Sequence, residues 1–143
     1  MNKNFEWSQE GRENLSLELK IEGNAIVGVK MSCLGCLDFL NLSQKMKKKL
    51  SGPIINLLPP SGEDHSSMIW REVISRIQEE WQVPVTSEEL CHCRKISTQK
   101  VDRSIVYGAH TLEEVRHRTS ANTGCGTCKD DVAQMINYRL KIS

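Results

Sequence analysis

This 143-residue chain contains six cysteines, which are arranged as three close pairs. Thiols at such spacing could bind a metal or carry out redox chemistry. The pairs are Cys33 with Cys36, Cys91 with Cys93, and Cys125 with Cys128. In a reducing compartment, cysteines at such short spacings are more often metal ligands or redox groups than structural disulfides. The spacing therefore predicts a metal or cluster site.

The two C-terminal pairs together supply four thiolates, which is a complete tetrahedral ligand set. Soft thiolate ligands select zinc or iron–sulfur clusters. Zinc ribbons use two Cys-x-x-Cys pairs about 15–20 residues apart, whereas here 31 residues separate Cys93 from Cys125 and the first pair has a single intervening residue. Two irons, each held by one pair, fit this layout. The pattern favours a [2Fe–2S] cluster, and a zinc-stapled interaction module without a redox role is the alternative.

The residues beside these cysteines suit an anionic cluster. Gly124 and Gly126 let the backbone approach a sulfur closely, and Arg94 and Lys129 adjoin the ligands and offset negative charge. The second pair is expected at the beginning of a helix, where the positive end of the helix dipole favours thiolates.

Residues 90–140 resemble the BFD-type [2Fe–2S] domain, which occurs in bacterioferritin-associated ferredoxin, in the central part of NifU and in several reductases. The stretches that carry the resemblance are Gly108-Ala-His-Thr-Leu-Glu-Glu-Val-Arg116 and Ala121-Asn-Thr-Gly-Cys-Gly-Thr-Cys128. The family pattern is Cys-x-Cys followed at a distance by Cys-x-x-Cys. The resemblance implies four cluster ligands, which are Cys91, Cys93, Cys125 and Cys128.

The N-terminal pair, Cys33 and Cys36, is a candidate secondary thiol site. Two thiols cannot complete a four-coordinate metal site within one chain, although a homodimer would supply two more. The Ile26-Val-Gly-Val-Lys-Met stretch and Gly35-Cys36 resemble the start of the IscU-type scaffold domain, which NifU places before its BFD-type domain. This sequence departs from that pattern because no further cysteine precedes Cys91. The N-terminal part is therefore either a shortened scaffold-like domain or an unrelated α/β docking module.

The patterning predicts an α+β fold: an N-terminal β-hairpin with helices, then a small all-α helix-turn-helix domain of BFD type. The expected domains are residues 1–86 and residues 87–143. Residues 1–14 are polar and are expected to be mobile. Apolar residues alternate from Leu15 to Ile21, which predicts a strand. Gly23-Asn24 then predicts a turn into a returning strand at residues 25–31.

Helical periodicity predicts two helices in the rest of the N-terminal domain. The first begins near Leu37, carries Leu37, Leu40, Leu42 and Met46, and ends near Ser51-Gly52-Pro53. Residues 53–62 contain three of the four prolines and are expected to be a connector. The second helix covers residues 66–82, with Trp70 and Trp81 on one face, and Pro84 ends it.

The C-terminal domain is expected to contain three helices. Ser97 is the expected cap of a helix at residues 98–107, and Gly108 suits the position just past its end. Thr111-Leu-Glu-Glu114 is a capping box that opens a second helix, and a third covers residues 127–140. The predicted core consists of Ile96, Val101, Ile105, Val106, Leu112, Val115, Val132, Met135, Ile136 and Leu140.

Composition limits the function classes. The chain has 19 Lys and Arg against 18 Asp and Glu, a net charge of +1, which argues against nucleic-acid or polybasic membrane partners. No apolar run approaches the roughly 20 residues that span a bilayer, and the polar N-terminus does not resemble a signal peptide. We expect a cytoplasmic protein that is not an enzyme, since no spacing indicates a catalytic triad or phosphate loop. The expected function is one-electron transfer linked to iron–sulfur assembly or iron metabolism, with a redox or assembly protein as partner.

Overall fold

The computed structural model describes residues 1–86, 88–91, 96–119 and 129–140. These residues form two compact units. The first holds a four-stranded sheet with helices α1 and α2, and the second holds the short strands β5 and β6 with helices α3 to α5. Residues 1–62 and 66–81 belong to the first unit, and residues 63–65 and 82–143 belong to the second. The last passage between the units, from Trp81 to Gln82, comes five residues before the domain boundary that the sequence predicts.

The sheet of the first unit is antiparallel with the order β1-β2-β3-β4. Its strands are β1 (Asn2–Ser8), β2 (Asn14–Glu22), β3 (Ala25–Leu34) and β4 (Gly52–Pro53). The predicted hairpin is confirmed: Glu22 pairs with Ala25, and both residues of the turn have positive φ, 57° at Gly23 and 64° at Asn24. Positive φ at both central residues is what a two-residue turn of type I′ requires.

The prediction that residues 1–14 are mobile is wrong, because β1 lies in this segment and pairs with β2 along its whole length. Phe5 and Trp7 stand two residues apart and so point to the same face of the strand. Trp7 is buried, and its indole Nε1 donates a hydrogen bond to Glu72 at 3.2 Å. Burial of this aromatic side chain stabilises a strand whose other residues are mostly polar.

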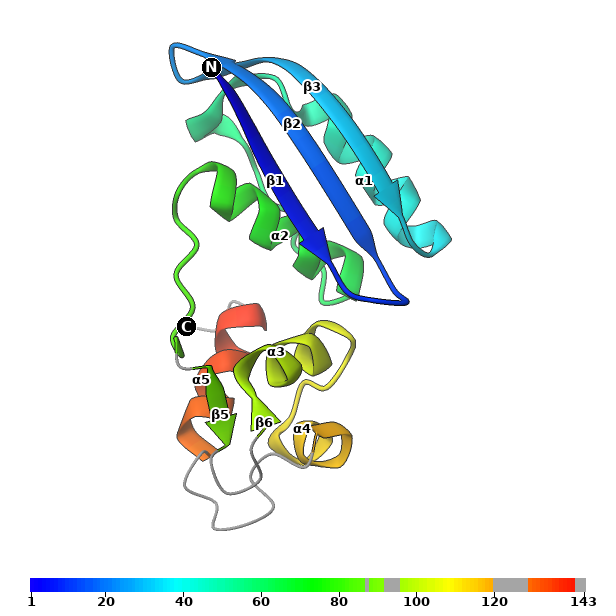
Figure 1. Ribbon diagram of the computed structural model, residues 1–143, viewed down its shortest axis with the longest axis vertical. Helices are drawn as coiled ribbons and strands as arrows, with labels where there is room; N and C mark the ends of the chain where they lie inside the picture. Colours follow the sequence, from blue (N-terminus) through cyan, green and yellow to red (C-terminus); the bar gives the residue numbers. More distant parts are fainter. Residues whose placement is uncertain (87, 92–95, 120–128, 141–143) are drawn as a thin grey trace. The chain divides into compact units, whose positions relative to one another are not determined.

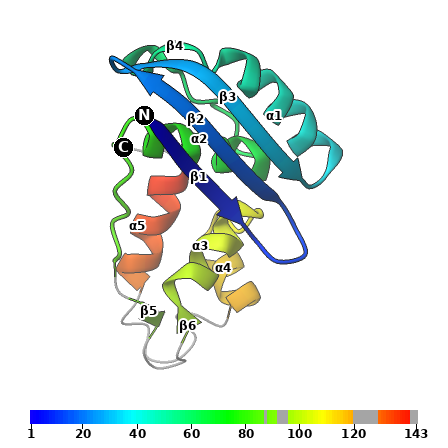
Figure 2. The same ribbon diagram turned by 45° about the horizontal axis from the view of Figure 1, so that its top comes forward.

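Helices α1 (Leu37–Lys49) and α2 (His65–Ile77) lie against one face of the sheet (Figures 1 and 2). Leu15, Leu17, Leu19 and Ile21 of β2 point to that face and are all buried. The buried residues of α1 are Phe39, Ser43 and Met46, whereas Leu37 is exposed. Ser43 is a polar residue in this buried place, and its Oγ accepts a hydrogen bond from Trp70 Nε1 of α2 at 2.9 Å.

The connector between these helices has little regular structure beyond β4 and a 3-10 turn (Ile54–Asn56). Helix α2 ends at Ile77, before the expected end near residue 82, so Trp81 does not share a helical face with Trp70. The cause is Glu79, which has a φ of 61°. The amides of Glu79 and Glu80 bond back to Arg76 and Ser75, which is the hydrogen-bond pattern of a Schellman helix end.

The second unit is not purely helical as predicted, because β5 (Glu89–Cys91) and β6 (Ile96–Ser97) form an antiparallel pair. The helices are α3 (Thr98–Val106), α4 (Leu112–Thr119) and α5 (Lys129–Leu140). The predicted cap of α3 is confirmed, since Ser97 Oγ accepts a hydrogen bond from the amide of Lys100 at 3.0 Å. Gly108 ends this helix with a φ of 114°.

Most of the predicted core of the second unit is confirmed, with three additions that the periodicity missed: Val85, Leu90 and Ala109. Val106 is buried as well, but it does not belong to this cluster. Ile96, Leu112 and Leu140 pack against this core but are only partly buried. The capping box of α4 is present, because the amide of Glu114 donates to Thr111 Oγ1 at 3.1 Å. Among the described residues, no helix has both the length and the apolar character needed to cross a bilayer.

Candidate functional site

The four predicted cluster ligands lie at the edges of the described part of the second unit. The backbone of Cys91 is the last position of β5. The side chain of Cys91, together with Cys93, Cys125 and Cys128, lies outside the described residues. The structure therefore describes how the segments that flank the ligands are held, and the ligand set itself stays a prediction.

The first cysteine pair is bounded by the β5–β6 pairing. Cys91 pairs with Ile96 and Glu89 pairs with Ser97, so the chain reverses direction between Cys91 and Ile96. The side chain of Leu90 is only 2% exposed and belongs to the core of this unit. The amide of Thr98 also donates to the Glu88 carbonyl at 2.8 Å. These contacts fix both ends of the segment that carries Cys91 and Cys93.

The second cysteine pair is bounded by α4 and α5. Helix α4 ends at Thr119, which is buried and whose Oγ1 donates to the Val115 carbonyl at 2.8 Å. Helix α5 begins at Lys129, immediately after Cys128. This order agrees with the expectation that the second pair lies at the beginning of a helix, and residue 127, where that helix is predicted to begin, lies outside the described residues.

A buried ion pair joins the two helices that follow the cysteine pairs in the sequence. Arg139 of α5 donates two hydrogen bonds to Asp102 of α3, from Nε to Oδ1 and from Nη2 to Oδ2, both at 2.7 Å. The Arg139 side chain is 2% exposed and the Asp102 side chain is 12% exposed. Two parallel bonds to one carboxylate fix the orientation of the partners as well as their distance. The two helices that follow the two cysteine pairs are thereby held together.

The chemistry of the donor set fits a [2Fe–2S] cluster. Such clusters are commonly held by four cysteine thiolates, and the sequence places four cysteines in the segments that this scaffold anchors. The core of this unit is formed mainly by apolar side chains from β5, α3, α4 and α5.

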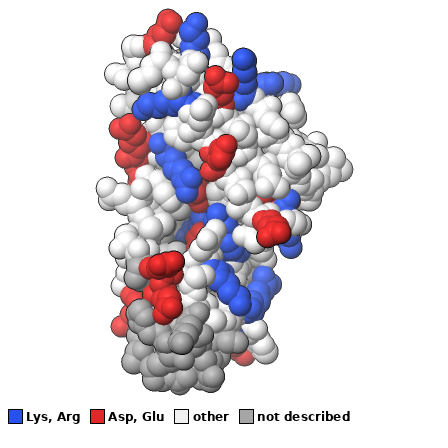
Figure 3. Space-filling model, in the orientation of Figure 1, with Lys and Arg blue, Asp and Glu red and all other residues white. Residues whose placement is uncertain are grey.

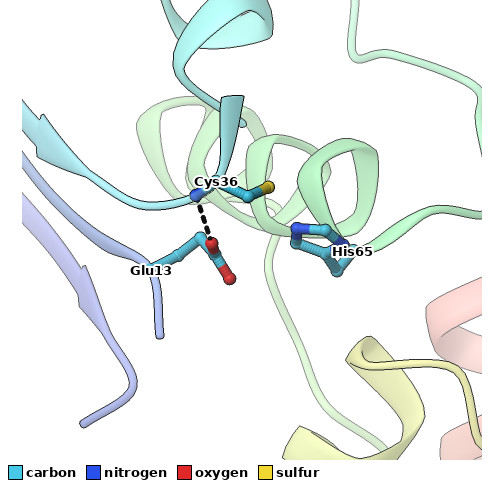
Figure 4. A group of neighbouring side chains, drawn as sticks. All are labelled: Glu13, Cys36 and His65. Atoms are coloured by element: carbon cyan, nitrogen blue, oxygen red, sulfur yellow. Dashed lines mark hydrogen bonds between the residues drawn. The ribbon is translucent and has the colours of Figure 1, made fainter. Parts of the chain in front are cut away.

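The N-terminal cysteines differ in their surroundings. Cys33 lies on β3 opposite Leu15, and its side chain is half-buried. Cys36 is exposed and occupies the N-cap position of α1. Its amide donates to Oε2 of Glu13 at 2.9 Å (Figure 4). The sequence did not point to Glu13, because nothing in the local pattern predicts that a carboxylate 23 residues away reaches the start of this helix.

Comparison with known proteins identifies the second unit. Residues 90–137 match the family of BFD-like [2Fe-2S] binding domains. The chain is also similar to the large subunit of nitrite reductase [NAD(P)H] from Klebsiella oxytoca, with 33% identity over 52 residues. That similarity covers 36% of this chain and 5% of the relative, so the chain spans only a small part of the relative's length.

No solved structure matches the chain. The family match begins at residue 90, so it does not cover the N-terminal unit. The comparisons do not show the predicted resemblance of that unit to a NifU-like scaffold. The anchored flanks, the four cysteines and the family match agree with one another. Residues 90–137 match BFD-like [2Fe-2S] binding domains, and this match supports a [2Fe–2S] cluster as the cofactor of the protein.

Proposed function

We propose that the protein is a one-electron carrier in which Cys91, Cys93, Cys125 and Cys128 hold the [2Fe–2S] cluster. The observation that carries the proposal is the family match over residues 90–137, which falls on a unit with its own apolar core. When bound, the cluster supplies a centre that accepts and releases one electron. Electron transfer requires no catalytic side chain of the protein, so we propose a carrier rather than an enzyme.

The role of this chain's own residues is to hold the ligands and balance their charge. Pairing of β5 with β6 holds the residues on both sides of the first cysteine pair, and the bond between Arg139 and Asp102 joins α5, which follows the second pair, to α3. Rigid surroundings limit how far the structure around the cluster changes when the cluster gains or loses an electron. Arg94 and Lys129 stand next to ligand cysteines in the sequence, and their positive charges oppose the negative charge of the thiolates.

The proposed partner is a redox protein, reached in the cytoplasm. The similar segment of the Klebsiella oxytoca relative is part of a nitrite reductase large subunit, which supports a redox setting. Basic and acidic side chains are interspersed on the face drawn in Figure 3, which agrees with the net charge of +1. Interspersed charge suits a protein partner better than a polyanion such as nucleic acid.

A role in iron–sulfur assembly is the second candidate. The observation that favours it is the exposure of Cys36, since an exposed thiol can exchange metal with a partner. Under this proposal the [2Fe–2S] cluster remains in the second unit while Cys36 takes part in delivery. A zinc-stapled interaction module without redox activity is the alternative that the same four cysteines allow.

A spectroelectrochemical titration of anaerobically purified protein tests the proposal. We expect the visible absorption of the cluster to bleach reversibly, following a one-electron Nernst curve, with one electron recovered per cluster on reoxidation. A protein that contains zinc in place of iron would show no such absorption. An apo iron–sulfur protein is then added as a possible cluster acceptor. If the titration is reversible and the cluster absorption does not change on this addition, the result favours electron transfer over an assembly role.

A further inference from the structure

One edge of the sheet in the first unit is open over a length that can hold another strand. Strand β3 pairs with β2 from Ala25 to Leu34, but it pairs with β4 only at Ala25 and Ile26 (Figure 2). The chain leaves the sheet at Cys36, where α1 begins. No other described strand lies beside β3, so residues 27–35 form an open edge. An open edge strand is a template for pairing with another chain.

The pairing of β2 shows which backbone groups this edge presents. Met1 and Ile21 exchange both backbone hydrogen bonds, at 2.8 and 3.1 Å, so the backbone of Ile21 faces β1. Backbone groups of successive strand residues point to opposite sides, so Lys20 faces β3, where it pairs with Gly28. The same alternation along β3 turns the amides and carbonyls of three residues away from β2. These residues are Val29, Met31 and Cys33.

The side chains of the same three residues lie on the face of the sheet that the helices cover. They stand opposite three leucines of β2 that are at most 3% exposed, but they are themselves only half-buried. Apolar side chains at an open edge lose further contact with water when another strand extends the sheet. Lys30 is the only charged residue among residues 27–35, so little opposes such pairing.

The geometry points to a second copy of this chain as the added strand, and we propose that β3 pairs antiparallel with the partner's β3 about a two-fold axis at Met31. Met31 is the midpoint of residues 27–35, so this register alone uses the whole open edge. Met31 then pairs with the partner's Met31, and Val29 pairs with the partner's Cys33. The same surface is used by both copies, as in most dimers with two-fold symmetry.

This register also matches shape and charge on the other face of the sheet. Leu34 is 68% exposed and would lie opposite the partner's Gly28. A cavity of about 320 Å³ lies beside Gly28, with Lys20 and Lys30 among its lining residues, and the partner's Leu34 would cover it. Lys30 would lie opposite the partner's Ser32, which avoids the destabilising effect of like charges that face each other across a strand pair. A segment of an unrelated protein would not require this symmetry of the edge.

Two variants should weaken the pairing and leave the fold of each copy intact. Leu34→Lys changes an exposed side chain and places its charge beside the partner's Lys20 and Lys30. Met31→Pro removes an amide that bonds across the two-fold axis, and proline is tolerated in edge strands where the amide points away from the sheet. Leu58→Lys is the matched control, because Leu58 is 79% exposed and lies in the connector, outside the open edge.

Sedimentation equilibrium of the full, cluster-loaded chain over a range of protein concentrations measures the dimer. We expect a dimer in the wild type and in Leu58→Lys, and at least about tenfold weaker dimerisation in Leu34→Lys and Met31→Pro. Circular dichroism checks the fold of each variant. A wild-type chain that is monomeric at every concentration would overturn the proposal, as would dimerisation of Leu34→Lys equal to that of the wild type. Neither result depends on whether the protein carries electrons.

A disulfide cross-link tests the register. Facing residues of a hydrogen-bonded antiparallel pair have Cα atoms about 5.5 Å apart, which a disulfide can span. In the background Cys33→Ala with Cys36→Ala, air oxidation of Met31→Cys should join two chains on a non-reducing gel. Ser16→Cys, on the central strand β2, is the control and should not cross-link. Equal cross-linking of these two variants would show that the copies do not meet at Met31.

Discussion

Arg139 and Asp102 form a buried, two-pronged ion pair, in which Nε and Nη2 of Arg139 each donate to one carboxylate oxygen at 2.7 Å. Arg103 adds a third contact to the same carboxylate at 3.1 Å. Asp102 lies on α3 and Arg139 on α5, and each of these helices follows one of the two C-terminal cysteine pairs. The ion pair therefore connects the two helices that follow the predicted cluster ligands in the sequence.

Replacing Asp102 by alanine should destabilise the second unit by about 3–5 kcal/mol, because it leaves a buried guanidinium without its main partner. Urea unfolding followed by cluster absorbance measures the effect. The double variant Asp102→Leu with Arg139→Met should recover most of the loss, since a buried pair replaced by apolar side chains often costs little. A loss below about 1 kcal/mol in Asp102→Ala would mean that the pair does not hold the helices together.

Gly35→Ala should destabilise the first unit by about 1–3 kcal/mol, the usual cost of forcing an extra carbon into a packed site. The added Cβ would lie under 3 Å from the carboxyl of Glu13 and the ring of Phe39. Gly28→Ala is the control, because its Cβ would meet only Lys20 Cβ at an ordinary 3.5 Å. Tryptophan fluorescence during urea unfolding reports on this unit. Equal stability of both variants would contradict the described packing around Gly35.

The double variant Cys33→Ala with Cys36→Ala should keep the full [2Fe–2S] absorption spectrum. These cysteines belong to the first unit, and four thiols of the second unit are sufficient for a [2Fe–2S] cluster. Iron and sulfide content per chain should equal the wild-type values. If the spectrum disappears while circular dichroism stays unchanged, the predicted ligand set is wrong.

Removal of the cluster should loosen the second unit much more than the first. A domain of about 60 residues buries only about 60% of its unfolded surface and is marginally stable alone. Ligation is absent from the unfolded chain, so its free energy adds to that of folding. Hydrogen exchange of apo and loaded protein measures this, with amides of α4 expected to lose protection and those of β2 and β3 to keep it. Equal protection of both units without iron would show that the apolar core alone holds the second unit.

Patterns that depend on neighbouring residues were predictable from the sequence. The alternation of apolar and polar residues, with the Gly23-Asn24 turn, predicted the β2–β3 hairpin. The capping residues Ser97 and Thr111 predicted where α3 and α4 begin. The second unit was the more predictable one, since its motifs are local and match a known family.

Features that depend on distant residues were not predictable. Strand β1 is stabilised by pairing with β2 and by the burial of Trp7 against α2, which a polar N-terminal sequence does not indicate. Helix α2 ends early because Glu79 adopts a positive φ, which is uncommon for a residue other than glycine. The approach of Glu13 to Cys36 depends on the path of three segments and on the absence of a side chain at Gly35.

The central claim is that four cysteines of the second unit hold one [2Fe–2S] cluster that carries one electron. The most direct measurement is electron paramagnetic resonance of dithionite-reduced protein, combined with iron and sulfide analysis, for the wild type and Cys125→Ser. We expect two irons, two sulfides and one unpaired spin per wild-type chain, with a sharp fall in all three in the variant. A wild-type signal that persists at full intensity in Cys125→Ser would contradict it.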